Sequence, residues 1–220
     1  EYHLLYLMSG KILFAYLHLA GVPQTLTKML LRNKVTGLAY ETIEDKDWLL
    51  PLLAPMSEVA GVAAVQFAAE YLQKKHGGCG ITLGKIRDVE AARVVIVGGG
   101  VAGVSAARTA VGMGARVTIL EKRRERVADL KKMFQEKPIS VVNTNNCDTA
   151  RYLRGAHVLI GATLHSGARA EHVISREQVL LTAQGAVIVD ISIDQGGCIW
   201  GSQGTTHEKP MFMKEGRVYC

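Results

Sequence analysis

The sequence contains few aromatic residues, few cysteines and no long hydrophobic run. Aromatic residues make up 6% of the chain, and its four cysteines (Cys79, Cys147, Cys198 and Cys220) are scattered with no CxxC spacing. That distribution argues against a disulfide framework and against a zinc site, and it favours a reducing, cytoplasmic compartment. No apolar run reaches the roughly 18–20 residues that cross a bilayer, so we expect no membrane partner. No basic segment precedes the short apolar stretch at residues 4–8, which argues against a signal peptide.

The charge is biased toward the positive sign, with a formal net charge of +6. Much of it lies between Lys122 and Lys132. A nucleic-acid-binding protein combines such a basic face with a recognisable reading element, and the chain has none. We therefore interpret the basic segment as a solvated helix face and expect no nucleic-acid partner. Hydrophobic residues make up 48% of the sequence, which is typical of an α/β protein with a core of Val, Ile, Leu and Ala.

The first third of the sequence predicts a short β-α-β piece followed by a long helix. Residues 11–19 are apolar on both alternating faces, which predicts a buried strand. After the break at residues 21–23, Thr25 is positioned to cap a helix through about Asn33, and residues 35–40 form a second strand. Pro51 and Pro55 mark a linker, and Ser57 begins a helix that ends near residue 75.

From Arg93 onward, strand patterns alternate with helix patterns. The predicted strands are 94–97, 116–121, 140–142, 157–160 and 186–191, and the predicted helices are 101–113, 124–134, 148–153 and 176–181. This alternation predicts an α/β fold with a doubly wound parallel sheet.

The first strand of this series leads into a glycine loop, Gly98-Gly99-Gly100-Val101-Ala102-Gly103, with the spacing G-x-G-x-x-G. Gly98 permits a tight turn, Gly100 lets the backbone approach a pyrophosphate, and Gly103 lets the following helix pack closely on the strand. The N-terminus of that helix offers free N–H groups to phosphates. Because a strand precedes the loop and a helix and a second strand follow it, the unit predicts a Rossmann-type dinucleotide-binding domain.

The second strand ends in Glu121, at the position that sets the choice of dinucleotide. A carboxylate there accepts hydrogen bonds from the adenosine ribose and repels a 2′-phosphate, which favours NAD. The basic neighbours Lys122, Arg123 and Arg124 favour NADP, because a cation accommodates that phosphate. We expect NAD and leave NADP as the alternative.

Two later strands and one early strand end in further candidate site residues. The loop after residue 160 is rich in small residues, and the loop after residue 191 carries Asp194 followed by two glycines. Ligands of open parallel sheets bind beyond the carboxyl ends of the strands, where these loops lie. Taken alone, Asp194 fits a turn or capping role better than a catalytic one, and His18 at the end of the first strand fits a packed histidine better than a catalytic one.

The combined motifs resemble alanine dehydrogenase, in the family that also contains the α subunit of nicotinamide nucleotide transhydrogenase. The matching runs are FAYLHLA (14–20), LLAPMSEVAG (52–61), VGGGVAG (97–103), AVGMGA (110–115), LIGA (159–162), IDQGGC (193–198) and TTH (205–207). Two of them, APMSEVAG and IDQGGC, resemble the alanine dehydrogenase branch rather than the transhydrogenase branch.

This resemblance implies reversible, NAD-dependent oxidative deamination of L-alanine to pyruvate and ammonia. It gives His18 an acid/base role at the substrate carbonyl, places Tyr16 beside the substrate, and makes Asp194 the catalytic carboxylate. It implies the following cofactor-binding residues: Ser57, Gly98, Gly100, Val101, Gly103, Glu121, Arg126, Thr144, Thr163, Leu164, Ile191, Ser192, Ile193 and Asp194. Glu121 departs from the family's usual aspartate. No metal site is implied.

The resemblance also implies an organisation. Residues 1–54 would be part of an N-terminal catalytic domain, residues 55–76 an interdomain helix, and residues 77–220 the NAD-binding Rossmann domain, within a cytoplasmic hexamer. The family's substrate-binding Arg and Lys match positions before Glu1, and further elements match positions beyond Cys220. We therefore expect this chain alone to be an incomplete, inactive enzyme. The alternatives are a transhydrogenase α-subunit-like NAD(H)-binding protein and a catalytically silent, truncated nucleotide-binding homologue.

Overall fold

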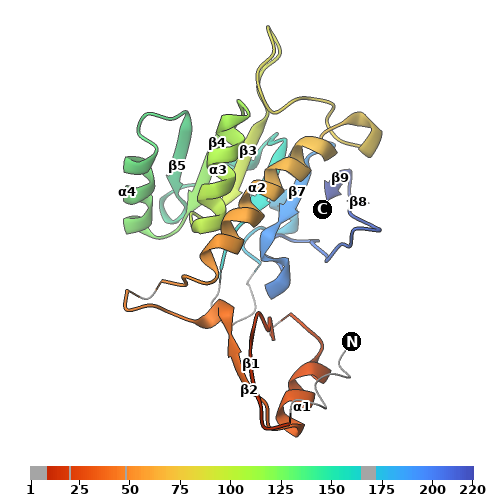
Figure 1. The fold of residues 1–220 in the computed structure, drawn as a ribbon. Coiled ribbons are helices and arrows are strands. Elements are labelled where there is room, and N and C mark those ends of the chain that lie inside the picture. Colours follow the sequence, from red (N-terminus) through yellow and green to blue (C-terminus); the bar gives the residue numbers. More distant parts are fainter. Residues whose placement is uncertain (1–8, 20, 48, 165–171) are drawn as a thin grey trace.

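The computed structural model describes residues 9–19, 21–47, 49–164 and 172–220. Within these residues the chain forms one seven-stranded sheet and a separate two-stranded sheet (Figure 1). In spatial order the large sheet contains β5 (Ile139–Asn143), β4 (Arg116–Glu121), β3 (Arg93–Val97), β6 (Val158–Gly161), β7 (Val187–Asp190), β9 (Arg217–Tyr219) and β8 (Phe212–Lys214). All neighbouring pairs are parallel except β8–β9.

The strand order is that of a Rossmann sheet. β3, β4 and β5 run outward on one side, and the chain then crosses back to place β6 on the other side of β3. Such a reversal leaves a crevice at the carboxyl ends of β3 and β6, where dinucleotides bind in this fold. The predicted fold class, a doubly wound parallel sheet of the Rossmann type with part of a second α/β domain, is confirmed.

Helices cover both faces of the large sheet, which explains why its central strands are apolar throughout. Val94 and Ile96 pack on the face with α2 (Ala54–Tyr71), α3 (Val101–Gly112) and α4 (Arg124–Met133). Val95 and Val97 pack on the opposite face with α5 (Ala150–Leu153) and α6 (Arg176–Val179). A strand buried on both faces has no polar alternation, so a continuous Val/Ile run is what the structure requires.

Helix α2 begins at Ala54, three residues before the predicted start at Ser57, and the predicted linker at Pro55 is wrong. Pro55 lies in the first turn of the helix, where a missing N–H costs no intrahelical hydrogen bond. The helix packs tightly on α3, because a Cβ at Gly61 would lie 2.3 Å from the carbonyl oxygen of Ala102. A short 3-10 helix, η3 (Lys74–His76), follows it. The division into residues 1–54, 55–76 and 77–220 stays a prediction.

The small sheet pairs β1 (Ile12–Ala15) in parallel with β2 (Thr36–Ala39), and α1 (Gln24–Arg32) connects them. The predicted β-α-β order is confirmed, but the prediction of a buried first strand is wrong. Ile12 is 67% exposed and Phe14 50% exposed, because no second layer of the described residues covers that face. The predicted cap is also wrong, since Pro23 occupies the N-cap position and no side chain caps α1.

The hairpin β8–β9 at the edge of the large sheet is missing from the predicted elements. Its turn consists of Glu215 and Gly216, with φ values of +48° and +74°. Two successive positive φ values are typical of the tight turns that join antiparallel strands. The Glu215-Gly216 pair is the local sequence feature that could have indicated this turn. Among the described residues, no helix is long and apolar enough to cross a membrane.

Candidate cofactor and substrate site

The glycine loop makes the turn that its spacing predicts. Gly98 has φ +105°, a value that favours glycine, and a Cβ there would lie 2.4 Å from the carbonyl oxygen of Ala162. The Gly98 N–H donates to the carbonyl of Leu120 at 2.8 Å. The loop is therefore fixed between β4 on one side and the end of β6 on the other.

The other two glycines of the motif have different surroundings. A Cβ at Gly103 would lie 2.0 Å from the Gly98 carbonyl oxygen, so α3 can reach the turn only because this side chain is absent. Around Gly100, the N-cap residue of α3, a Cβ would meet nothing within 4 Å. Val101, the first residue of the helix, is 43% exposed. The free N–H groups at the start of α3 thus lie beside open space, where an anion can approach them.

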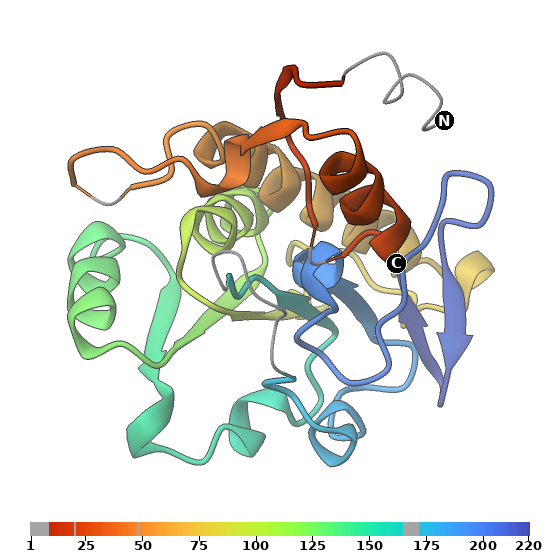
Figure 2. The ribbon, with the colours of Figure 1, turned by 90° about the horizontal axis from the view of Figure 1, so that it is seen from below.

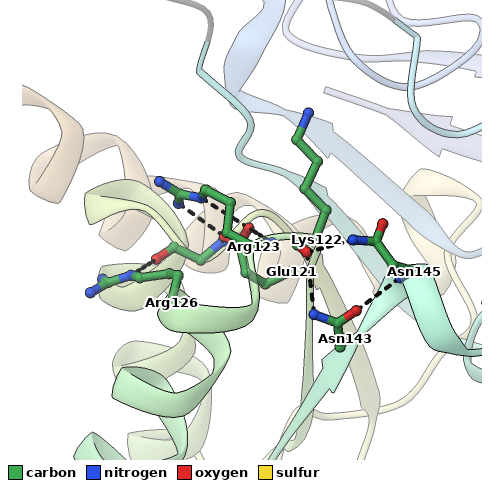
Figure 3. Close-up of polar contacts among 7 residues, drawn as sticks. Glu121, Lys122, Arg123, Arg126, Asn143 and Asn145 are labelled. Carbon is green, nitrogen blue, oxygen red and sulfur yellow. Dashed lines mark hydrogen bonds and ion pairs between the residues drawn. The ribbon is translucent and has the colours of Figure 1, made fainter.

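Glu121, at the carboxyl end of β4, is the most enclosed charged group beside this loop, with a side chain that is 5% exposed. Its Oε2 accepts hydrogen bonds from the Gly99 N–H (3.0 Å) and from Nη2 of Arg123 (3.1 Å). Its Oε1 accepts from the Arg123 N–H (2.9 Å) and from Nε of Arg123 (3.1 Å; Figure 3). Burial alone would raise the pKa of Glu121, but the hydrogen bonds from Arg123 and Gly99 outweigh burial, so its pKa lies below the ordinary value. The carboxylate is therefore ionised at neutral pH.

Arg126 and the residues after β5 complete this edge of the loop. Nε of Arg126, on α4, donates to the Gly99 carbonyl at 2.7 Å. The amides of Asn143 and Asn145 both donate to the Lys122 carbonyl, at 3.2 and 2.9 Å (Figure 3). Thr144 lies between these asparagines, as the first residue of η4 (Thr144–Asn146). The structure thus brings Glu121 and Arg126 to the glycine turn, and Thr144 follows β5, the strand next to β4.

The loops after β6 and β7 are joined by their predicted cofactor residues. The Ser192 hydroxyl donates to the Thr163 carbonyl at 2.6 Å, and the two hydroxyl oxygens lie 3.5 Å apart. Leu164, the next residue, is 54% exposed. Ile191, Ser192, Ile193 and Asp194 form most of η5 (Ile191–Gln195), so the strand predicted to reach residue 191 ends at Asp190 instead. The small-residue loop continues into residues 165–171, which lie outside the described residues.

Asp190 fixes the shape of this second loop, and the sequence analysis did not single it out. Its carboxylate accepts backbone hydrogen bonds from Ser192 (3.1 Å), Cys198 (2.8 Å) and Ile199 (2.9 Å). A buried carboxylate with three N–H donors closes the loop at both ends and holds Asp194 in the turn between them. Burial, followed by the charge of Asp190, raises the pKa of the Cys198 thiol to about 11, so that cysteine stays protonated.

His18, just after β1, has an unusual backbone conformation that the partly buried carboxylate of Glu41 supports. Its φ is +46°, a value uncommon for residues other than glycine, which costs of order 1 kcal/mol or more unless the surroundings hold it. The Glu41 carboxylate accepts the His18 N–H at 2.7 Å and also the Leu17 N–H. Glu41 is a second site residue that the sequence analysis missed, because its signal lies in the tertiary contact and in no local pattern.

The turn that follows His18 touches the loop that carries Asp194. The Gly21 N–H donates to the His18 carbonyl, and a Cβ at Gly21 would lie 1.8 Å from the Asp194 carbonyl oxygen. Both ribbon views show the end of β1 beside η5 (Figures 1 and 2). The two predicted catalytic residues therefore belong to one neighbourhood, although they come from different sheets.

Tyr16 and Ser57 are the remaining members of the predicted set. The Tyr16 ring stacks on His18 with centroids 5.8 Å apart, and its hydroxyl donates to the Leu52 carbonyl at 2.5 Å. That bond connects β1 to the segment before α2. Ser57 lies in the second turn of α2, with its N–H bonded to the Leu53 carbonyl. Among the hydrogen bonds of the described residues, none joins Ser57 to the glycine loop.

Comparison with known proteins gives this arrangement a family. The family described as alanine dehydrogenase/PNT, C-terminal domain, matches residues 64–220, and the corresponding N-terminal domain matches residues 1–60. The chain belongs to the alanine dehydrogenase/PNT family. An alanine dehydrogenase of Methanococcus maripaludis is 48% identical over 96% of this chain, and one of Geobacillus stearothermophilus is 43% identical over 97%. The chain spans 56% and 57% of those relatives.

Solved structures agree with this assignment to the alanine dehydrogenase/PNT family. An L-alanine dehydrogenase superposes with a TM-score of 0.85 at 40% identity, covering 95% of this chain and 57% of that one. A transhydrogenase from Sinorhizobium meliloti superposes with a TM-score of 0.74 at 21% identity, which supports the fold alone. The predicted family resemblance is confirmed, and so is the Rossmann-type fold.

Proposed function

We propose that the full-length protein is an L-alanine dehydrogenase, which converts L-alanine, NAD and water reversibly to pyruvate, ammonium, NADH and a proton. The observation that carries the proposal is the contact between Gly21 and Asp194. It brings the turn after His18 against the loop at the carboxyl end of β7, beside the crevice where a Rossmann sheet binds its dinucleotide. The relatives named alanine dehydrogenase support the choice of substrate.

The proposed cofactor site offers polar groups suited to the pyrophosphate and to the adenosine ribose of a dinucleotide. The start of α3 offers N–H groups beside open space for the pyrophosphate, and Glu121 lies where the adenosine ribose binds in this fold. We assign Thr163, Leu164 and residues 191–194 to the nicotinamide end, because they follow β6 and β7 at the carboxyl edge of the sheet. When bound, the nicotinamide supplies the hydride acceptor.

The proposed chemistry divides proton handling between two side chains. Hydride leaves Cα of alanine, and the amine becomes an imine. Asp194 accepts a proton from the water that attacks the imine carbon. His18 donates a proton to the nitrogen on that carbon, so the C–N bond breaks, ammonia leaves and pyruvate forms. Tyr16 packs against the His18 ring and restricts its orientation.

The test is alanine-dependent NADH formation by the full-length protein. We expect His18→Gln and Asp194→Asn each to lower kcat by at least about 100-fold, the usual range for losing a general acid or base. The matched controls are His172→Gln and Asp88→Asn, which change exposed residues and should leave the rate unchanged. Normal rates in both site variants would contradict the catalytic assignment. Dinucleotide binding with no alanine oxidation by the unaltered protein would favour the silent-homologue alternative.

The assembly and the activity of this chain alone belong to the same proposal. The relatives are nearly twice as long as this chain, so we propose that residues 1–220 alone bind NAD but do not oxidise alanine. We also propose a cytoplasmic homohexamer. Light scattering of the full-length protein measures its mass directly, and a monomer or dimer would contradict the hexamer.

A further inference from the structure

The hydrogen bonds on Glu121 leave no acceptor position for a ribose. An ionised carboxylate has about four acceptor sites, two on each oxygen. Here four donors fill them: the backbone N–H groups of Gly99 and Arg123, and Nε and Nη2 of the Arg123 side chain. A ribose diol that binds this carboxylate must therefore displace two of these donors.

The displaceable pair is the Arg123 guanidinium. The two backbone donors belong to the glycine loop and to the start of the α4 connection, so removing them would open the fold. The Arg123 side chain is 60% exposed, whereas the carboxylate that it covers is 5% exposed. Its fork presents two parallel N–H donors to the two oxygens, as a 2′,3′-diol presents two O–H donors. The Arg123 guanidinium thus covers both oxygens of the Glu121 carboxylate (Figure 3).

The other basic residues of this segment are engaged differently. Arg126 donates through Nε to the Gly99 carbonyl. The side chain of Lys122 points away from the Glu121 carboxylate in Figure 3, and its carbonyl is held by two asparagine amides. Among the hydrogen bonds of the described residues, Arg123 is the only side chain that donates to Glu121. One residue therefore controls access to this carboxylate.

We propose that Arg123 is a specificity-determining residue that narrows the preference of this site for NAD over NADP. This inference rests on the proposed dinucleotide site. Arg123 acts in two ways. It competes with the ribose diol of NAD for Glu121, which weakens NAD binding. Once displaced, its guanidinium lies beside the ribose 2′ position, where it pairs with the 2′-phosphate of NADP and offsets the repulsion from Glu121.

The experiment measures binding rather than turnover. Dissociation constants of NAD and NADP are determined by calorimetry on the full-length protein and on three variants. In Arg123→Ala we expect NAD to bind about threefold tighter and NADP about tenfold weaker, given the modest strength of partly exposed ion pairs. Arg124→Ala is the matched control, because it removes the same charge from the next, exposed position. We expect Arg124→Ala to change each dissociation constant by less than about twofold, because a distant surface charge acts on the ligand only through a screened electrostatic interaction.

Arg123→Lys separates the two effects. Lysine keeps the cation but lacks the planar fork, so it competes poorly for the two carboxylate oxygens and still attracts a phosphate. We expect tighter NAD binding, as in the alanine variant, with NADP binding close to that of the unaltered protein. An unchanged ratio of the two constants in Arg123→Ala, or an equal change in Arg124→Ala, would overturn the inference while leaving the dinucleotide site intact. Failure of the unaltered protein to bind either dinucleotide would instead overturn the proposed function.

Discussion

Two β-α-β units of this chain share a topology and differ in almost everything else. The unit β3-α3-β4 is enclosed, with Ile96 and Ile119 fully buried and Gly98 in contact with the neighbouring strand β6. The unit β1-α1-β2 leaves Ile12 and Phe14 exposed. Because both units contain similar apolar residues, the connectivity does not bury a core by itself. Burial comes from strands and helices on either side of a unit. The unit β3-α3-β4 has such neighbours, and the unit β1-α1-β2 lacks them among the described residues.

The largest expected effect comes from breaking the enclosed unit at Gly103. In Gly103→Ala the new Cβ would lie 2.0 Å from the backbone carbonyl of Gly98, and backbone cannot move aside as a flexible side chain can. We expect the free energy of unfolding to fall by about 3 kcal/mol, the upper range for overpacking. Urea unfolding measures it.

The matched control lies at the other end of the same helix. A Cβ at Gly112 would meet nothing within 4 Å, so Gly112→Ala should stabilise the protein by about 0.5–1 kcal/mol through helix propensity alone. Equal destabilisation by the two substitutions would show that the contact with the turn is unimportant.

The contrast between the two units also explains which parts of the fold and of the candidate site could be predicted from the sequence. The glycine loop, Glu121 and the alternating strands and helices from β3 to β7 are local signals, and the structure contains these elements in the predicted order. The exposure of Phe14 and the support of His18 by Glu41 depend on contacts between distant segments, and no pattern along the chain encodes them. Asp190 lies between these two cases, because only part of its role can be predicted from the local sequence. It follows a predicted strand, but its role needs the N–H groups of residues 198 and 199 to return to it.

The next largest expected effect is a fall in kcat when Glu41, which directly follows the exposed unit β1-α1-β2, is replaced by glutamine. Glu41→Gln keeps the size of the side chain but removes the charge that strengthens its bonds to the N–H groups of Leu17 and His18. The strained φ of His18 is then less well held, and its imidazole moves from its working position. We expect kcat for alanine in the full-length protein to fall about 10- to 100-fold, since small misplacements of a catalytic group have effects of that size.

A double-mutant cycle separates positioning from general destabilisation. If Glu41 acts through His18, adding Glu41→Gln to a His18→Gln protein should lower the remaining rate no further. Glu44→Gln changes an exposed acid three residues away and serves as the control. Independent, multiplicative losses in the double variant would mean that Glu41 supports the fold without acting on His18.

The smallest expected effect is a pH dependence of the enclosed unit. His157, the residue before β6, accepts the backbone N–H of Arg93 through Nδ1 at 3.0 Å, which requires a neutral ring. Burial, followed by the nearby charge of Arg93, lowers the pKa of His157 below its ordinary value. The unfolded chain therefore binds a proton more readily than the folded one, so stability is fully present above about pH 6.5 and falls as the pH drops below it. Urea unfolding at pH 7.5 and 5.5 should show this fall in the unaltered protein and a smaller one in His157→Asn. The same slope in both proteins would place the titrating group elsewhere.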